Sequence, residues 1–211
     1  MCGICGFTGQ IEQRENTIKK MTEVITHRGP DSDGFYQNDY ISMGFRRLSI
    51  IDLDEGHQPI YNEDKSLVLT FNGEIYNYKD LRKELIELGH KFYTETDSEV
   101  LIHAFEEWDE EMFEHLRGMF AFAIYNTQTK ALFLARDFFG IKPLHYTMIG
   151  NDFCYASEIK SILEHPDFHK EFNEKALDHY LSFQYCPQPL TFFKDVYCLL
   201  PGHFMWFRDG V

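Results

Sequence analysis

The chain has 211 residues, of which 44% are hydrophobic and 16% aromatic, so it is long enough for one domain with a substantial core. Its formal net charge is −14 and its Lys and Arg residues form no long cluster, which disfavours binding to nucleic acids or to anionic membranes. The sequence has no apolar segment of membrane-spanning length and no signal peptide, and its five cysteines are scattered, so we expect a cytoplasmic protein with reduced thiols.

Hydrophobic periodicity predicts an α+β chain with mostly antiparallel strands. In the first half of the chain we predict a strand at 3–9, a helix around 18–25, a strand at 67–71 that ends in a turn at Asn72-Gly73, a helix from Asn77 to Gly89 and a helix capped by Asp97. In the second half we predict strands at 119–125 and 131–136, a hairpin of 143–148 and 153–156, and helices at 157–163 and 173–183. A last apolar run lies at 203–207. The caps rest on the preference of Asn and Asp for helix starts and of Gly for helix ends.

The segment 119–125 is the most informative strand. Phe120, Phe122 and Ile124 point to one side, and the residues between them are also largely apolar. A strand that is hidden on both faces belongs to a sheet that is covered twice. Together with the antiparallel hairpins, this favours a four-layer α-β-β-α sandwich of two antiparallel sheets.

Cys2 becomes the first residue if the initiator methionine is removed. An N-terminal cysteine carries both a nucleophile and a base, because its freed α-amino group, with a pKa of about 8, can accept the proton of its own thiol. A cysteine at this position is in most proteins a packed or inert thiol, so the rest of the sequence must support a catalytic role.

Four other positions carry groups that suit catalysis on an amino-acid amide. Asn72 and Gly73 could donate hydrogen bonds to an oxyanion, although Asn-Gly is more often an ordinary turn. Arg47 could bind a carboxylate with its planar guanidinium, or form a surface salt bridge. Asp97 could accept from a substrate ammonium, or simply cap its helix.

Eight segments, in order along the chain, resemble the glutaminase half of the class II, N-terminal-cysteine glutamine amidotransferases, and in particular of the asparagine synthetases. They are MCGICGFTG at 1–9, HRGPDSDG at 27–34, RRLSIIDL at 46–53, FNGEIYNY at 71–78, TDSEVLIHAF at 96–105, GMFAFAIYN at 118–126, LFLARDFFGIKPLHY at 132–146 and ASEIKSIL at 156–163. The resemblance implies the N-terminal-nucleophile hydrolase fold, in agreement with the sandwich favoured by the strand pattern.

The resemblance also implies a role for each matching residue. Cys2 corresponds to the nucleophile, and Asn72 and Gly73 correspond to the oxyanion donors. The residues implied to bind the substrate L-glutamine are Arg47, Leu48, Ser49, Ile50, Ile51, Asn72, Gly73, Glu74 and Asp97, with Arg47 at the α-carboxylate and Asp97 at the α-ammonium. The implied reaction converts glutamine and water into glutamate and ammonia through a thioester on Cys2.

The resemblance assigns residues 1–211 to a single glutaminase domain. The ATP-dependent synthetase domain of the family is absent from these residues, so we expect it to follow in cis, where ATP and Mg²⁺ would act, and we expect no cofactor for this domain. In the full-length protein the ammonia would be used to make asparagine from aspartate. The acceptor could instead be another carboxylate, and two copies could pair through this domain as a homodimer.

Two other functional classes remain as alternatives. A domain of this fold could be non-catalytic or regulatory, although retention of Cys2, Arg47, Asn72 and Asp97 weighs against this. Cys2 and Cys5 also form a CxxC pair, which suits thiol redox chemistry or zinc in other proteins. The pair opens the chain, and no second Cys/His pair lies at zinc spacing, so we predict no metal site.

Overall fold

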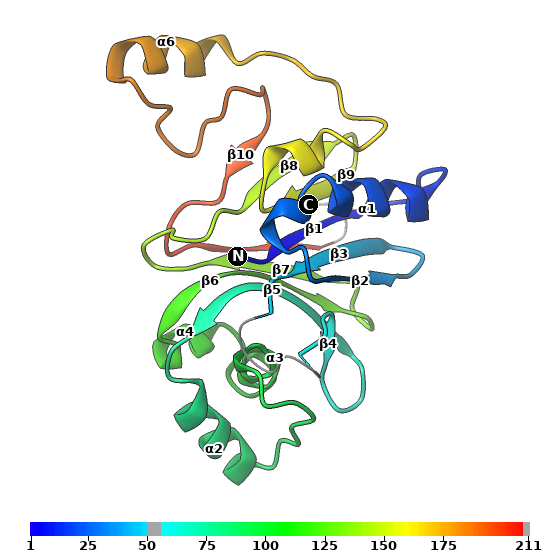
Figure 1. Cartoon of the computed structure of the whole chain (residues 1–211), viewed down its shortest axis with the longest axis vertical. Coiled ribbons are helices and arrows are strands. Elements are labelled where there is room, and N and C mark those ends of the chain that lie inside the picture. Colours follow the sequence, from blue (N-terminus) through cyan, green and yellow to red (C-terminus); the bar gives the residue numbers. More distant parts are fainter. Residues whose placement is uncertain (50–55, 209–211) are drawn as a thin grey trace.

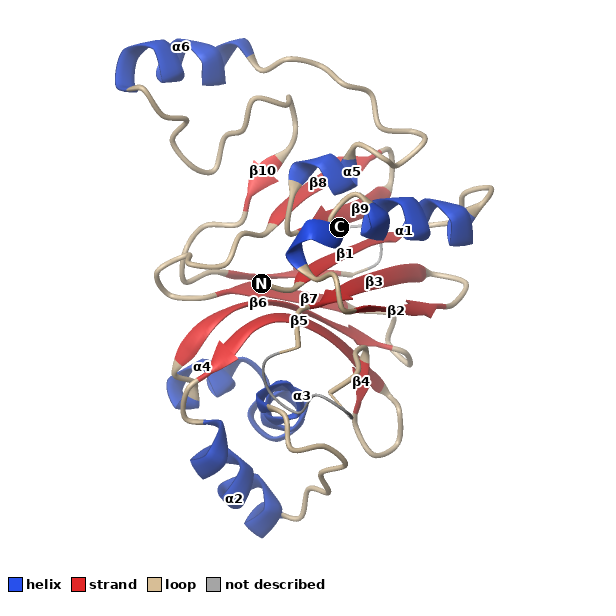
Figure 2. Cartoon of the chain, viewed as in Figure 1, coloured by secondary structure: helices blue, strands red, loops and turns tan. Residues whose placement is uncertain are grey.

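Two antiparallel sheets form the centre of the chain in the computed structural model, which describes residues 1–49 and 56–208 (Figures 1 and 2). In that part, the first sheet has the order β10-β8-β9-β1-β3-β2 and the second has the order β11-β7-β6-β5-β4. The strands are β1 (Gly3–Thr8), β2 (Ser32–Gln37), β3 (Ile41–Arg47), β4 (Ile60–Tyr61), β5 (Leu67–Ile75), β6 (Gly118–Asn126), β7 (Leu132–Arg136), β8 (His145–Ile149), β9 (Asp152–Ala156), β10 (Tyr197–Cys198) and β11 (Phe204–Phe207).

Helices cover the outer face of each sheet. The helices are α1 (Arg14–Glu23), α2 (Tyr78–Leu88), α3 (Asp97–Trp108), α4 (Met112–His115), α5 (Ile159–Ile162) and α6 (Glu174–Phe183). Figure 2 shows α1 and α5 on one side of the paired sheets and α2, α3 and α4 on the other, while α6 projects away from the sandwich. The predicted α-β-β-α arrangement is therefore confirmed. No helix in the described residues is long and apolar enough to cross a membrane.

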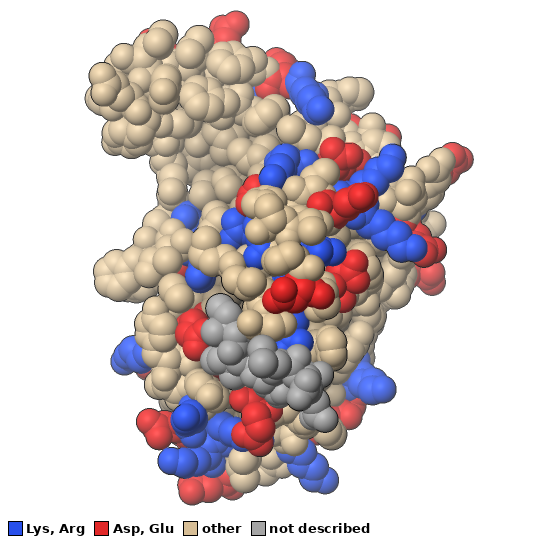
Figure 3. All heavy atoms as spheres, viewed as in Figure 1, with Lys and Arg blue, Asp and Glu red and all other residues tan. Residues whose placement is uncertain are grey.

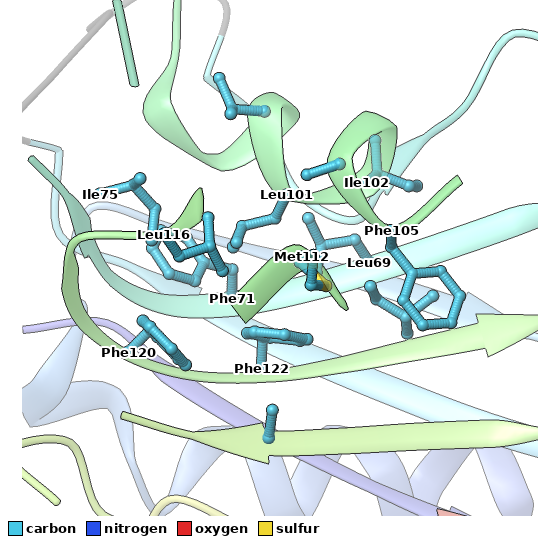
Figure 4. Close-up of a cluster of buried hydrophobic side chains, with 14 of the residues drawn as sticks. Leu69, Phe71, Ile75, Leu101, Ile102, Phe105, Met112, Leu116, Phe120 and Phe122 are labelled. Atoms are coloured by element: carbon cyan, nitrogen blue, oxygen red, sulfur yellow. The ribbon is translucent and has the colours of Figure 1, made fainter. Parts of the chain in front are cut away.

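Strand β6 explains why the layers stack in this way. Phe120, Phe122 and Ile124 pack into the core under α3, as the close-up in Figure 4 shows for the two phenylalanines. Ala123 and Tyr125 point the other way, into the core between the two sheets. A third cluster, which includes Phe7, lies between the first sheet and α1. Alternating side chains of one strand thus contribute to two cores, as the sequence pattern predicts.

The helices behind the second sheet begin and end close to their predicted positions. Asn77 is the N-cap residue of α2, and Gly89 ends that helix with a φ of 112°, a conformation that glycine adopts at little cost. The side chain of Asn77 does not cap the helix; its Oδ1 accepts a hydrogen bond from the backbone N–H of Arg117 at 2.9 Å. Thr96, not Asp97, occupies the N-cap position of α3, so the predicted cap is displaced by one residue.

Two sequence predictions about strands are wrong. Asn72 and Gly73 do not form a turn, because β5 continues through them to Ile75 and pairs them with Ala121 and Phe120 of β6. Strands β2, β3 and β4 were not predicted at all, yet β3 is the central partner of β1. The pairing of β1 with β3 sets Gly3 opposite Arg46, which brings the start of the chain beside the end of β3.

Positive and negative side chains are interspersed on the face seen in Figure 3, and no continuous basic patch covers it. The α6 region at the top of that view carries few charges, and its exposed side chains include Leu181, Phe183 and Tyr185.

Candidate active site

The Cys2 side chain lies where β1 begins, beside the residue that follows β3. Its Sγ accepts a hydrogen bond from the backbone N–H of Leu48 at 3.4 Å and lies 3.7 Å from the Leu48 carbonyl oxygen. The backbone of Cys2 is held from the other side, because Arg28 Nε donates to its carbonyl oxygen at 2.9 Å. Arg28 in turn pairs with Glu158 at 3.0 Å. These contacts hold the Cys2 thiol between the start of β1 and the end of β3.

Burial raises the pKa of the Cys2 thiol, although the Leu48 N–H and the charge of Arg47 oppose the shift. The thiol is therefore the favoured form at neutral pH, and a base must take its proton before sulfur can attack. The Asp97 carboxylate also raises the Cys2 pKa. The charges of both Arg47 and Asp97 therefore act on the Cys2 thiol.

A cavity of about 150 Å³ joins most of the residues that the sequence singles out. The predicted site residues that line it are Cys2, Arg47, Leu48, Asn72, Gly73, Glu74 and Asp97. Ser49 is not among its lining residues; its backbone N–H donates to Asp31 Oδ2 at 2.7 Å. Ile50 and Ile51 lie outside the described residues. Segments far apart in the sequence therefore converge on one small cavity.

The Asn72 amide has an unusual environment for a buried group. The side chain is 1% exposed, and its Nδ2 has no hydrogen-bond partner among the described residues. An unsatisfied buried donor costs roughly 1–3 kcal/mol, so such groups are rare unless a ligand completes them. A donor held without a partner in the same cavity as a thiol is suited to receive an oxyanion.

Gly73 is required by close packing and not by a turn. A Cβ at this position would lie 2.3 Å from the Met119 carbonyl oxygen and 2.8 Å from the Phe120 Cα, both on the paired strand β6. The two backbones can approach only because the side chain is absent. This approach leaves the backbone of Gly73 at the cavity beside the Asn72 amide.

Arg47 and Asp97 provide opposite charges in the same cavity. Arg47 is 5% exposed, so it is a buried cation and not a surface residue. Asp97 is 7% exposed, and its Oδ2 accepts from the backbone N–H of Ile75 at 2.9 Å. A buried cation and a buried anion that face one small cavity are complementary to the two charged ends of a free amino acid.

Burial, with a smaller contribution from Glu74, raises the pKa of Asp97 from 3.8 to about 6. The folded protein therefore binds a proton at Asp97 more tightly than the unfolded chain does. This favourable contribution is present below pH 4 and is lost as the pH rises through 6.

We therefore expect Asp97→Asn to raise the free energy of unfolding of the ligand-free protein by about 1–3 kcal/mol at pH 7.5, since one pKa unit corresponds to 1.36 kcal/mol. The gain should shrink towards zero near pH 4, where the wild-type carboxyl group is neutral too. Urea denaturation of both proteins across this range measures the difference. A variant that is less stable at pH 7.5, or a difference that does not change with pH, would contradict this account.

Several residues around the cavity were not singled out by the sequence. Gln58 lines it and holds the main chain of Phe71, accepting from its N–H at 2.6 Å and donating to its carbonyl at 3.2 Å. Lys142 is 4% exposed and its Nζ donates to Met1 Sδ at 3.2 Å. Burial lowers the Lys142 pKa, as does the charge of Arg28. Arg28, which stands in the HRGPDSDG motif, contacts the Cys2 backbone.

Comparison with known protein families identifies the domain that contains this cavity. Residues 1–211 match the glutamine amidotransferase domain. The chain belongs to this family. It is a class II glutamine amidotransferase domain, as its N-terminal sequence indicates. Asparagine synthetase [glutamine-hydrolyzing] 1 of Bacillus subtilis (strain 168) is 45% identical in an alignment of length 207 that covers 94% of this chain and 33% of the relative. Asparagine synthetase [glutamine-hydrolyzing] 3 of the same organism is 38% identical over all of this chain and 36% of the relative.

Two solved structures share the fold. The glutamine phosphoribosylpyrophosphate amidotransferase from B. subtilis superposes with a TM-score of 0.65 at 22% identity, over 76% of this chain and 43% of that one. A structure described as the allosteric regulatory enzyme of purine biosynthesis gives a TM-score of 0.67 at 23% identity, over 77% of this chain and 43% of that one. The fold is that of an N-terminal-nucleophile hydrolase. This amidotransferase domain spans about a third of the length of the B. subtilis synthetases that it matches.

Proposed function

We propose that this domain hydrolyses L-glutamine to L-glutamate and ammonia, with Cys2 as the nucleophile. The observation that carries the proposal is the buried Asn72 Nδ2, which has no partner among the described residues and lies in the same cavity as the Cys2 thiol. A thiol beside a preorganised donor suits attack on a carbonyl group, and the amide of glutamine matches the family to which the domain belongs.

The proposed reaction has two steps that balance. Cys2 Sγ transfers its proton to the α-amino group freed by removal of Met1 and attacks the side-chain amide carbon of glutamine. Asn72 Nδ2 and the Gly73 N–H stabilise the oxyanion, the C–N bond breaks, and ammonia leaves with the transferred proton. Water then attacks the γ-glutamyl thioester, which releases glutamate and restores the thiol.

The charges in the cavity would select the free amino acid. Arg47 would bind the α-carboxylate and Asp97, with Glu74 beside it, would accept from the α-ammonium. Leu48 would lie along the substrate, and the same is proposed for Ser49, Ile50 and Ile51 from their place in the RRLSIIDL motif. A zwitterion has one charge of each sign, so this pair satisfies both ends.

The names of the B. subtilis relatives support a further step. We infer that the ammonia passes to an ATP-dependent synthetase domain in cis, in the cytoplasm, which makes asparagine from aspartate. ATP and Mg²⁺ would act in that domain, and the glutaminase reaction itself needs no cofactor. An acceptor with a different carboxylate is the alternative for the transfer step.

Release of ammonia from glutamine tests the proposal directly. The chain, with removal of Met1 verified by mass, should release glutamate and ammonia in equal amounts from glutamine and neither from asparagine. The absence of both products in a folded sample with a free Cys2 would refute the hydrolase assignment and favour the non-catalytic alternative.

Replacing Arg47 by alanine should raise the KM for glutamine by roughly 10–150-fold, because a hydrogen bond to a charged group contributes about 1.5–3 kcal/mol. The kcat should change much less, since the α-carboxylate does not react. Arg46→Ala is the matched control: its side chain alternates to the other face of β3 and pairs with Asp33 at 3.3 Å. Steady-state kinetics with both variants make the measurement, and an unchanged KM in Arg47→Ala would remove Arg47 from the binding site.

A further inference from the structure

A cluster of histidines and glutamates lies outside the glutaminase cavity, where the chain after β4 meets α2 and α3. The cluster consists of Glu63, His90, His103 and Glu106, and one ligand atom from each lies within 4.8 Å of the others. Glu63 follows β4, His90 follows the glycine that ends α2, and His103 and Glu106 are one turn apart on α3. Figure 1 shows α3 end-on with β4 and α2 on either side. We propose that these four residues bind one divalent transition-metal ion, with zinc as the best match.

The spacing of the ligand atoms is the first reason. His103 Nδ1 lies 3.5 Å from Glu63 Oε2 and 3.8 Å from Glu106 Oε2. His90 Nδ1 lies 3.6 Å from Glu63 and 3.7 Å from Glu106 Oε2. These separations are too long for hydrogen bonds. They approach from the long side the edge of a tetrahedron of ligands around zinc, which is about 3.3–3.6 Å for bonds of about 2.0–2.2 Å. His103 faces Oε2 of Glu63, and His90 faces Oε1 of the same carboxylate.

The burial of His103 is a second, independent reason. Its side chain is 0% exposed, and neither ring nitrogen has a hydrogen-bond partner among the described residues. A buried imidazole without partners is unfavourable. A metal ion between its Nδ1 and the two glutamates would satisfy the nitrogen that the fold leaves open.

The outer contacts also resemble those of metal sites. His90 Nε2, the nitrogen away from the cluster, lies within hydrogen-bond distance of Glu107 Oε2, at 3.1 Å. His103 Nε2 faces Glu99 Oε1 at 3.5 Å, which is longer than a hydrogen bond. Such carboxylates fix the tautomer and orientation of a ligating histidine. The glutamates are also held: Glu63 Oε1 accepts from the Lys91 N–H at 2.8 Å, and Glu106 Oε1 accepts from the Asn62 amide at 3.1 Å.

Charge favours a cation as the occupant. Four carboxylates surround the two imidazoles, namely those of Glu63, Glu99, Glu106 and Glu107. In the part of the chain that the structure describes, no Lys or Arg forms a salt bridge with any of them. A divalent ion would neutralise the two inner glutamates and tie α3 to α2 and to the chain after β4. The mixed N and O donor set suits zinc better than Mg²⁺, which prefers oxygen ligands.

Sequence reasoning predicts no metal site because it looks for Cys and His at short spacings, whereas these ligands come from three separate segments. The inference is independent of the proposed glutaminase activity, since it concerns a different set of residues and a structural role.

Metal analysis and thermal unfolding of the whole chain test this site. The protein is first treated with a chelator, which is then removed. Each chain should then bind one Zn²⁺ ion, and Zn²⁺ at a hundredfold excess over its Kd should raise the Tm of the protein by roughly 5–10 °C. Mg²⁺ at the same concentration should not raise it. Co²⁺ in the same site should give the strong visible absorption of tetrahedral coordination, which a network of protonated histidines would not produce.

Variants assign the binding to these residues. His90→Gln and Glu106→Gln, which avoid the fully buried His103, should weaken Zn²⁺ binding by more than the 10–100-fold expected for the outer-shell Glu107→Gln. Glu111→Gln, an exposed glutamate just beyond α3, should bind as the wild type does. A wild-type protein that binds no Zn²⁺, or one whose Zn²⁺ affinity is unchanged by His90→Gln and Glu106→Gln, would overturn the proposal.

Discussion

Replacing Cys2 by alanine should abolish the release of ammonia from glutamine while the fold remains intact. Without sulfur no thioester can form, and loss of a nucleophile in a comparable hydrolase lowers kcat on the order of 10⁶-fold. The side chain is half-buried and makes two weak hydrogen bonds with the Leu48 main chain, so the stability should change little. Ammonia release and the Tm, measured on the same sample, separate the two effects.

Cys186→Ala is the matched control. Cys186 is also half-buried, and its Sγ donates to the Leu190 carbonyl oxygen at 3.3 Å, away from the cavity. This variant should keep full activity. If Cys2→Ala retained a rate comparable to that of Cys186→Ala, the thioester route would be wrong.

Replacing Asn72 by alanine should lower kcat by about 10²–10³-fold, or roughly 2.7–4 kcal/mol of transition-state stabilisation, with little change in KM. The reason is that Asn72 Nδ2 has no partner among the described residues, so its hydrogen bond would be made to the charge that develops during the reaction. Loss of an interaction made only in the transition state lowers kcat and leaves ground-state binding unchanged. Steady-state kinetics with glutamine measure both constants.

A second asparagine separates catalysis from stability in this experiment. Asn38, between β2 and β3, has a side chain that accepts from the backbone N–H of Tyr40 at 2.9 Å and of Ile41 at 3.0 Å. Asn38→Ala should lower the Tm and leave kcat unchanged. If Asn72→Ala instead raised KM at an unaltered kcat, Asn72 would be a binding residue and not an oxyanion donor.

The layers of the fold are predictable because their cause is local. Strand β6 carries apolar side chains on both faces, and α2 and α3 carry clear helical faces with polar residues at their starts. Strands β2 and β3 are harder to predict because their signals are short and mixed. The side chains of β2 alternate only between half-buried and exposed, and both strands are stabilised by pairing with segments far away in sequence. Such tertiary context overrides local propensity.

The candidate site also has a part that the sequence predicts and a part that depends on tertiary structure. Its charged and nucleophilic residues stand in recognisable motifs, so the sequence alone points to Cys2, Arg47 and Asp97. The turn that the sequence predicts at Asn72-Gly73 does not form. The turn preference of Asn-Gly is overridden by the pairing of β5 with β6. Neither Gln58 nor Lys142 stands in a sequence pattern that predicts a place in the site. They reach the cavity only because folding brings their segments beside it.

The most direct test of the central claim is the intact mass of the protein before and after exposure to a glutamine analogue with an electrophilic side-chain carbon. The account predicts that the untreated protein has the mass of a chain without Met1. Treatment should add the mass of one adduct per chain, and peptide mapping should place this adduct on Cys2. Ammonia release should fall in proportion to the fraction of chains modified. Glutamine should protect against the modification. Full ammonia release by a chain that keeps Met1, or an adduct on another cysteine that leaves the activity intact, would contradict it.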